Sequence, residues 1–284
     1  MIQRSSLPVT AASNAFDVTP RGYYKWKRRS PPLDADIMLR NNIQEIALEF
    51  PKYGYRRMTH TLHRNGSRVN HKRVLRIMRE EHLLVRRKKF KPKTTQSKHG
   101  LPKYHNLVKD ITPVRVNQIW VSDITYIHLQ REFVYLAVIM DIFSRRCIGW
   151  SLSRNPDTQL TLDALNMAIG LRGKENVNGC IHHSDQGVQY AAHAYVQRLK
   201  EVGMLPSMGE VGNSYENAFA ESLIKSIKNE EVWMNEYETM EDVYRNIKRF
   251  IEEVYNKKRL HSSIGYRPPI EYETQKVLNI GNEA

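Results

Sequence analysis

Apolar residues recur along the chain at two different spacings, and the change falls near residue 117. Before it the spacing is helical: one helix is predicted from about residue 34 to 50, where Pro51 stops it. A second is predicted over 57–64, ending at Gly66, and a third begins after Asn70 as N-cap. The last two form a helix-turn-helix shape. The buried face of the first helix is predicted to be Ile37, Ile43, Ala47 and Phe50.

After residue 117 the apolar runs are short and rich in β-branched and aromatic residues, which is typical of strands. Runs over 119–127, 133–140 and 147–152 predict an antiparallel meander of largely buried strands. Further along, helices and strands alternate: helices are predicted over 157–171, 189–202 and 217–229, and strands over 180–183 and 205–208. This order predicts a mixed α/β sheet covered by helices.

The charge is distributed unevenly. Residues 1–104 carry 24 Lys and Arg against 7 Asp and Glu, a balance of +17, whereas residues 105–284 carry 20 against 23. A basic segment joined to a near-neutral body favours a polyanionic partner such as nucleic acid, because cations near phosphates release condensed counterions. An ordinary solvated surface is the less favoured reading, since the excess is so concentrated.

Candidate DNA contacts lie in three basic places in this segment. They are the second helix of the helix-turn-helix, the start of its first helix, and an extended basic linker over 86–103. A purely structural hairpin and a spacer without contacts are the alternatives. The candidates are Lys72, Arg73 and Arg76, then Arg56 and Arg57, then Arg86, Arg87, Lys88 and Lys89.

Several classes of protein are excluded by composition. No run of about 18 apolar residues is present, so no membrane span is expected. The first residues do not form a convincing secretory signal. The two cysteines, Cys147 and Cys180, cannot make a four-ligand zinc site and read as buried thiols in a reducing compartment, the cytoplasm.

These patterns divide the chain into five expected segments. A basic helical segment covers 1–52, the helix-turn-helix 53–85 and the basic linker 86–115. An α/β core with a C-terminal helical motif covers 116–275, and a tail covers 276–284.

Three acidic residues stand where acids are costly. Asp123 interrupts a buried strand, Asp185 ends another, and Glu221 lies on a helix opposite Leu223 and Ile227. A right-handed crossover would place the Asp185 strand parallel to the Asp123 strand, about 4.8 Å away, and bring the helix over both. Converging carboxylates suit hard divalent ions. From spacing alone, three scattered acids are a weak signal.

Several motifs resemble the retroviral-integrase-like superfamily of transposases, and within it the second-reading-frame proteins of bacterial insertion-sequence family three. They are WVSDITYI, MDIFSRRCIGW, HHSDQGVQY, GNSYENAFAESLIKSIKNE and YNKKRLHSSIGYRPPIEY, with an accessory helix-turn-helix before them. The spacing matches too: 35 residues separate Asp185 from Glu221, and Lys228 follows Glu221 by seven. The resemblance covers nearly the whole chain.

The resemblance implies a ribonuclease-H-like, mixed five-stranded sheet with flanking helices, preceded by a small all-α helix-turn-helix region. It implies that Asp123, Asp185 and Glu221 are a catalytic triad holding Mg²⁺ or Mn²⁺, expected as two ions per site. Lys228, with Lys225 on the same helix face, would contact the terminal DNA of the element. The expected reaction is cleavage of element ends followed by strand transfer, with circle formation and then insertion.

The resemblance also implies partners. They are element-end and target DNA, an oligomer of the same chain on that DNA, and the protein of an upstream reading frame or a fusion with it. The segment before residue 27 resembles the junction region of such proteins rather than a complete recognition domain. The expected location is the bacterial cytoplasm, in association with the nucleoid.

Two rival functions stay open: a nuclease of the same fold that does not join strands, and a DNA-binding protein without activity. Glu210 and Glu216 depart from the family's usual residues, with weaker local DNA contacts as the expected effect.

Some residues outside the triad favour structural roles. Asp141 is expected to pair with Arg145 or to cap a turn, and His182 and His183 to satisfy hydrogen bonds rather than bind metal. The C-terminal residues Asn256, Arg259 and His261 fit two roles equally, touching DNA or bracing the catalytic helix.

Overall fold

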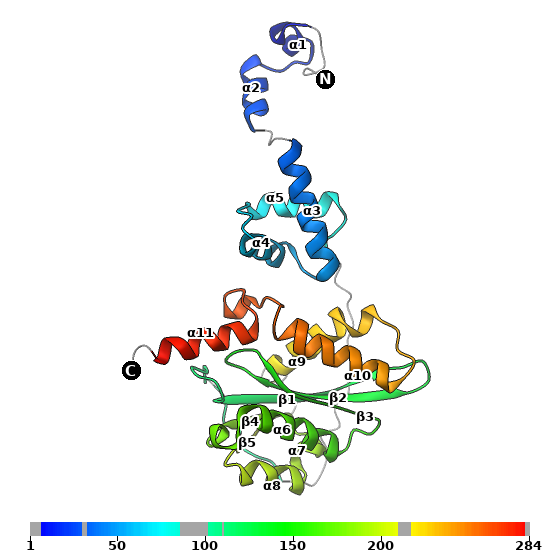
Figure 1. The fold of residues 1–284 in the computed structure, drawn as a ribbon, viewed down its shortest axis with the longest axis vertical. Helices are drawn as coiled ribbons and strands as arrows, with labels where there is room; N and C mark the ends of the chain where they lie inside the picture. The colour runs from blue at the N-terminus through cyan, green and yellow to red at the C-terminus, as the bar shows by residue number, and fades with distance from the viewer. Residues whose placement is uncertain (1–6, 30–32, 86–101, 110, 210–216, 282–284) are drawn as a thin grey trace. The chain divides into compact units, whose positions relative to one another are not determined.

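A computed structural model describes residues 7–29, 33–85, 102–109, 111–209 and 217–281 of the chain. The chain divides into two compact units, Met1–Val85 and Arg86–Ala284. In its described part, the first unit contains the helices α1 (Val9–Ala15), α2 (Pro20–Arg29), α3 (Leu33–Glu49), α4 (Tyr55–Arg64) and α5 (His71–Glu80) (Figure 1).

The helical hairpin predicted before residue 85 is present as α4 and α5. The side-chain oxygen of Asn70 accepts a hydrogen bond from the Lys72 backbone N–H at 2.8 Å, which confirms Asn70 as the cap of α5. Gly66 follows α4 with φ 85°, a left-handed conformation that glycine adopts without strain. Helix α3 contacts both helices. The buried apolar side chains of these three helices and the turn after α3 are Leu39, Ile43, Ile46, Phe50, Tyr53, Met58, Leu62, Val74, Ile77 and Met78.

One predicted core position in α3 is wrong. Ile37 is 49% exposed, and Leu39 and Ile46 are buried beside Ile43. The pattern allowed two neighbouring apolar faces on this helix, and packing against α4 and α5 selects the face of Leu39.

Helices α1 and α2 form a second helical pair that the sequence analysis treated only as a basic segment. A turn at residues 16–19 joins them, in which Asp17 has φ 52° and the Val18 N–H donates to the Ser13 carbonyl oxygen at 3.0 Å. Ala12, Ser13 and Tyr23 are buried. The two helices therefore have a small interior of their own.

A five-stranded sheet forms the centre of the second unit, with strand order β3-β2-β1-β4-β5 (Figure 1). β1, β2 and β3 are antiparallel, whereas β4 runs parallel to both β1 and β5. The predicted meander, the parallel crossover strand and the mixed five-stranded sheet are thus confirmed. The strands are β1 (Ile119–His128), β2 (Phe133–Asp141), β3 (Cys147–Ser153), β4 (Ile181–Ser184) and β5 (Leu205–Met208).

Helices cover both faces of this sheet (Figure 1). On one side lie α6 (Thr158–Arg172), α7 (Val188–Ala191) and α8 (His193–Glu201), and on the other α9 (Ala218–Glu230) and α10 (Met240–Arg249). Successive residues of β1 enter opposite cores: Trp120 packs with α6 and α8, and Val121 packs with α9 and α10. Helix α6 lies so close to β3 that a β-carbon at Gly149 would be 2.2 Å from the Ala164 carbonyl oxygen.

The single helix predicted over 189–202 is wrong, because an extended residue interrupts it. Ala192 has φ −60° and ψ 138°, so α7 ends before it and α8 begins after it. Tyr190 and Leu199 both pack into the core on the α6 side. Nine residues apart in an unbroken helix, they would point about 180° from each other. The break turns both toward the same core.

The chain after α10 returns to the sheet. It forms a π-helical segment η4 (Phe250–Tyr255), a 3₁₀ turn η5 (Ser262–Ile264) and the last helix α11 (Pro269–Gly281). Shorter 3₁₀ turns are η2 (Lys174–Val177) and η3 (Val232–Met234). Within the described ranges, every helix is too short or too polar to cross a membrane. Cys147 and Cys180 are buried free thiols, as predicted.

Candidate functional site

Asp123 lies on the middle strand of the sheet, on the face that carries α9. It pairs with Val138 of β2, and by strand alternation it shares its face with Val121 and Ile127, which belong to the apolar core on the α9 side. Its Oδ1 accepts a hydrogen bond from the Ile124 backbone N–H at 2.8 Å. A carboxylate in these surroundings is costly unless something compensates its charge.

Asp185 follows β4 directly and lies at the level of Asp123. The parallel register aligns Val121 of β1 with His183 of β4, so the residues two positions further on, Asp123 and Asp185, occupy equivalent places on neighbouring strands. The Asp185 Oδ1 accepts a hydrogen bond from the Gly187 N–H at 3.0 Å. A β-carbon on Gly187 would also lie 3.0 Å from that oxygen, so glycine allows the loop to close around the carboxylate.

Glu221 lies in the first turn of α9 and is exposed, while Leu223 and Ile227 of the same helix are buried. The predicted face of Glu221 is therefore confirmed. The side chain of Asn217 donates from Nδ2 to the Ser122 carbonyl oxygen at 3.2 Å. This bond fixes the start of α9 beside the residue that precedes Asp123.

The pKa of Asp123 shows that the acids interact. This pKa is raised from 3.8 to about 8, mainly by burial and then by the charge of Asp185. The Ile124 N–H opposes the rise, Glu221 adds to it, and the nearby charge of Lys228 lowers it. All four charged groups are therefore within electrostatic reach of one another across β1, β4 and α9.

The donor set fits a divalent cation. Carboxylate oxygens are hard ligands of the kind that Mg²⁺ and Mn²⁺ prefer, and a bound cation relieves the repulsion that raises the Asp123 pKa. Among the described residues, no three His, Cys, Asp or Glu side chains already stand in a metal-holding arrangement.

The lysines of α9 differ in their surroundings. Lys225 is exposed, but Lys228 is half-buried, with its Nζ 4.5 Å from the centroid of the Tyr126 ring. Burial lowers the Lys228 pKa, and the charge of Asp123 raises it. Lys228 is therefore a cation held beside the carboxylates, and Tyr126 is a partner that the sequence analysis missed.

The two histidines before Asp185 are hydrogen-bonded in the interior, as expected. The Tyr195 hydroxyl lies 3.0 Å from the His182 Nε2, and the His183 Nδ1 lies 2.9 Å from the Ser207 Oγ. Burial, together with the neighbouring His183, lowers the pKa of His182 to about 3. His182 is thus neutral and supports the end of β4 rather than the acidic cluster.

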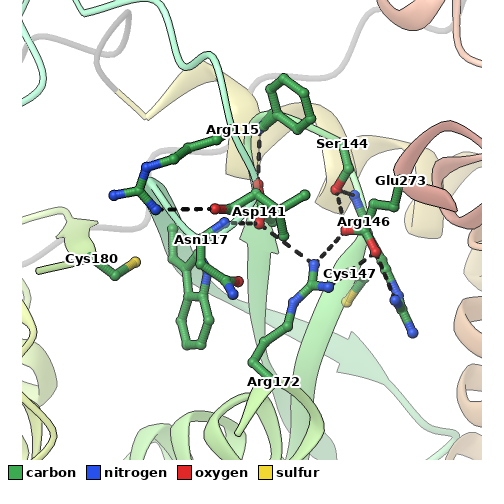
Figure 2. Close-up of polar contacts among 12 residues, drawn as sticks. Arg115, Asn117, Asp141, Ser144, Arg146, Cys147, Arg172, Cys180 and Glu273 are labelled. Carbon is green, nitrogen blue, oxygen red and sulfur yellow. Dashed lines mark hydrogen bonds and ion pairs between the residues drawn. The ribbon is translucent and has the colours of Figure 1, made fainter. Parts of the chain in front are cut away.

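Asp141 caps a turn, which is one of the two roles expected for it, and its ion pair is with Arg172 rather than with Arg145. Its carboxylate accepts from the backbone N–H groups of Asn117 at 2.8 Å and Phe143 at 3.0 Å, and it pairs with Arg172 at 3.5 Å (Figure 2). The Arg145 guanidinium instead lies over the Phe219 ring of α9, 4.3 Å from its centroid. Burial raises the pKa of Asp141 to about 6.

The same polar cluster anchors the last helix. Glu273 of α11 accepts hydrogen bonds from the Ser144 hydroxyl and the Arg146 Nη1, each at 2.7 Å, and from the Arg172 Nη1 at 3.0 Å (Figure 2). Arg172 and Glu273 carried no sequence signal, because each occupies a helix position that usually faces solvent. The cluster holds α11 against the ends of β2 and α6.

The C-terminal motif packs into the second unit, which favours the bracing role of the two left open. The Asn256 Oδ1 accepts from the Cys147 N–H at 3.0 Å, and its Nδ2 donates to the Cys147 carbonyl oxygen at 2.8 Å. Arg259 binds Glu230, the last residue of α9. His261 is 7% exposed and stacks edge-on against Tyr255. All three side chains are turned inward.

The basic candidates of the first unit are not equally available. Arg73 donates to Asp36 of α3 at 2.6 Å, and Arg76 pairs with Glu80 at 2.9 Å and with Asp36 at 3.4 Å, so both charges are partly neutralised. Lys72 is exposed on α5. The Arg56 and Arg57 guanidinium groups lie 5.7 and 5.6 Å from the ring centroids of Tyr55 and Tyr53.

Other candidates lie outside the described residues. They are the linker residues Arg86, Arg87, Lys88 and Lys89, and the two departures from the family pattern, Glu210 and Glu216.

Known domain families match most of the chain. Residues 113–214 and 202–269 match two families described as "Integrase core domain", and residues 34–91 match one described as "HTH-like domain". The first two include β1, β4 and α9, and the third includes α3, α4 and α5.

Whole-chain relatives are insertion-sequence transposases. The chain is 34% identical to the transposase for insertion sequence element IS629 of Shigella sonnei, over 99% of this chain and 96% of that protein. It is 31% identical to the transposase InsF for insertion sequence IS3A of Escherichia coli, over 96% of each. Among solved structures, it is similar to a chain of the simian T-cell lymphotropic virus intasome in complex with PP2A regulatory subunit B56 gamma. That likeness has 15% identity and a TM-score of 0.49, over 76% of this chain and 70% of that one.

Proposed function

The chain belongs to the transposases of insertion-sequence family three, which carry an integrase core, and we propose that Asp123, Asp185 and Glu221 hold its catalytic divalent metal ions. As a member of this family it is a DNA transposase, which cleaves the ends of an element and joins them to other DNA. Its α/β unit is the integrase core, and α3 to α5 belong to its HTH-like domain.

The strand register that puts Asp123 beside Asp185 carries the proposed site. The pKa of Asp123 agrees with it: this pKa is raised to about 8, mainly by burial, then by the charge of Asp185, with Glu221 contributing in the same direction. Because the charges of Asp185 and Glu221 both act on the Asp123 carboxyl group, the three acids lie near one another. A protein that keeps such a repulsive cluster in a costly setting has a use for it, and metal binding is the use that fits oxygen ligands.

The backbone positions of the three acids suit different tasks. Asp123 on β1 and Asp185 after β4 are held by the sheet, so they provide fixed oxygens, and Glu221 completes the set from α9. We propose Mg²⁺ or Mn²⁺ as the bound metal, with two ions per site. When bound, such a pair activates an attacking oxygen and stabilises the leaving one in an in-line displacement.

The reaction has two phosphoryl transfers. Water attacks the phosphodiester at an element end and frees a 3′-hydroxyl, which then attacks a second phosphodiester and joins the strands. Lys228, held between the Tyr126 ring and the Asp123 charge, is in place to hold a phosphate of the element end beside the acids. Lys225, on the same face one turn earlier, extends this contact along the DNA.

The first unit adds contacts that position DNA without chemistry. Lys72 of α5 and the pair Arg56 and Arg57 at the start of α4 are proposed phosphate contacts. The linker residues Arg86 to Lys89, which follow the first unit, are proposed to extend them. Arg73 and Arg76 share their charge with Asp36 and Glu80. We therefore assign them a smaller share of the DNA affinity than Lys72.

A second protein is proposed to supply recognition of the element ends. The chain contains no a/d heptad pattern sustained over three or four heptads, so pairing two ends through a coiled coil is not expected from it alone. The proposed supplier is the product of an upstream reading frame, acting separately or as a fusion, with several copies assembled on the DNA. Competition binding tests this: the lone chain should prefer specific over scrambled ends by about tenfold or less, whereas a preference of about a thousandfold would show that recognition is already complete.

The activity is tested with labelled element ends. The full chain, alone and fused to its upstream partner, is incubated with the ends in Mg²⁺, Mn²⁺ or EDTA, and the products are sized. Joined products longer than the substrate are expected with either metal and none in EDTA. Shortened products only, with either metal and for both proteins, would favour the rival nuclease.

A further inference from the structure

Helices α1 and α2 lie outside the segments that match the integrase core and HTH-like domains, which begin at residue 34. They nevertheless form an ordered pair of the helix-turn-helix kind: a seven-residue helix, a tight turn and a ten-residue helix.

The turn fixes the direction in which α2 leaves. Asp17 adopts φ 52°, and the Val18 N–H donates back to the Ser13 carbonyl oxygen at 3.0 Å. Thr19 then caps α2, because its Oγ1 accepts from the Gly22 N–H at 3.0 Å. A β-carbon on Gly22 would lie 3.0 Å from that oxygen, so glycine leaves room for the cap.

One face of α2 is turned inward. Tyr23 is 7% exposed, and Ala12 and Ser13 of α1 are 1% and 0% exposed. Helices α1 and α2 contact each other. The side of α2 opposite Tyr23 is consequently the side presented outward.

That outward side carries three cations. At about 100° per residue, Arg21, Lys25 and Arg28 fall within about 60° of one another and are centred opposite Tyr23. All three are exposed, and α2 contains no acidic residue. In the described part of the chain none of the three pairs with a carboxylate, unlike Arg73 and Arg76 of α5, which bind Asp36.

We propose that α2 is an additional DNA-contacting helix of this transposase, which lies against duplex DNA with Arg21, Lys25 and Arg28 on its phosphates. A cationic face with no acidic residue, on a helix held by a short partner helix, is suited to a phosphate backbone. Exposed Tyr24 lies at the edge of this face, where an aromatic ring contacts sugar and base edges. The inference is independent of the metal site, because it concerns binding rather than chemistry.

Two neighbouring lysines of α2 provide a matched test. Lys25 and Lys27 are both exposed, but they lie about 200° apart around the helix, and only Lys25 is on the cationic face. The affinity of the full chain for a labelled duplex is measured in EDTA over a series of salt concentrations. Lys25→Gln should reduce the slope of log K against log[salt] by about 0.9, the value for one lost phosphate contact. Lys27→Gln should leave it unchanged.

The combined variant Arg21→Gln/Lys25→Gln/Arg28→Gln should reduce the slope by about three such contacts. Far-UV circular dichroism checks that the helices are retained. Equal slopes for Lys25→Gln and Lys27→Gln, or an unchanged slope for the combined variant, would overturn the inference. Binding to anionic lipid vesicles is measured for the same proteins. A combined variant that loses vesicle binding while its DNA affinity is unchanged would also overturn the inference.

Kinetics separates this inference from the proposed metal site. At saturating protein, single-turnover cleavage by the combined variant should proceed at the wild-type rate, and only the concentration needed for half-saturation should rise. A slower rate at saturation would place these cations in the chemistry instead and contradict the inference.

Discussion

The guanidinium of Arg259 donates from Nε and Nη2 to the two carboxylate oxygens of Glu230, at 2.7 and 2.6 Å. Arg259 is 4% exposed, and its guanidinium also lies over the Tyr255 ring. Glu230 ends the helix on which Glu221 lies. The C-terminal motif therefore holds the far end of the helix that carries Glu221.

Removing this pair should destabilise the integrase core. Arg259→Met leaves Glu230 with its charge in a largely buried place, at an expected cost of about 3 kcal/mol in the free energy of unfolding. Arg259→Lys should recover only part of that, since an ammonium lacks the two-pronged geometry. Urea unfolding measures both. The control is Arg154→Met, whose exposed pair with Glu132 should be worth less than about 1 kcal/mol. Equal losses for Arg259→Met and Arg154→Met would contradict the bracing role.

The Asn256 side chain should not tolerate replacement by aspartate. Its amide bonds both the N–H and the carbonyl oxygen of Cys147, and a carboxylate would face that carbonyl with no hydrogen to donate. Asn256→Asp should therefore cost about 2 kcal/mol or more of stability. Asn155→Asp, at an exposed position, is the matched control. A melting temperature for Asn256→Asp within a degree of the control's would show that the pairing has no energetic weight.

Replacing Asp123 should stabilise the metal-free protein. Its pKa is about 8 in the fold against an ordinary 3.8, so the folded state prefers the protonated form. Wild type should lose stability as the pH rises from about 4 through 8, because deprotonation becomes favourable first in the unfolded chain. Asp123→Asn has no such loss and should be more stable at pH 8 by at least about 2 kcal/mol, with no difference near pH 4.

Thermal unfolding in EDTA over this pH range measures that difference. Asp163→Asn, at an exposed position, controls for general effects of removing an acid. Adding Mg²⁺ or Mn²⁺ should stabilise wild type and not Asp123→Asn. A stability gap between the two proteins that stays constant from pH 4 to 8 would contradict the raised pKa.

The regular elements were predictable because local patterns determine them. The strand predicted over 205–208 is β5 to the residue, and the strand over 119–127 is one residue shorter than β1. Asp123 and Asp185 became candidates because each lies in or directly after a run of buried strand residues, but that signal was weak, and only the resemblance to transposases singled them out. The parallel pairing of β4 with β1 followed from the handedness of the crossover.

The contacts that could not be predicted involve residues that are distant in sequence. Arg145 is four residues from Asp141 and was the obvious partner, but Arg172 arrives from the end of α6 and occupies that place. The break at Ala192 has no glycine or proline to announce it, and is set by the need to bury both Tyr190 and Leu199. The bracing role of Arg259 needed Glu230, 29 residues away, to be seen beside it.

The basic segment over residues 1–104 should dominate the salt dependence of DNA binding. Its charge balance of +17 predicts many phosphate contacts there. The fragment 105–284, which carries 20 Lys and Arg against 23 Asp and Glu, should bind DNA with a clearly flatter slope of log K against log[salt] than the full chain. A fragment slope equal to that of the full chain would place the main electrostatic contact in residues 105–284.

The yield of strand transfer from variants of the three acids tests the central claim most directly. Asp123→Asn, Asp185→Asn and Glu221→Gln are compared with wild type in the same preparation, with duplex affinity measured in parallel. Glu238→Gln, which removes an exposed acid from the same unit, is the control. Each triad variant should give less than about 1% of the wild-type joined product while binding DNA normally, and the control should join fully. A triad variant that joins DNA above that level would show that its acid does not hold the metal.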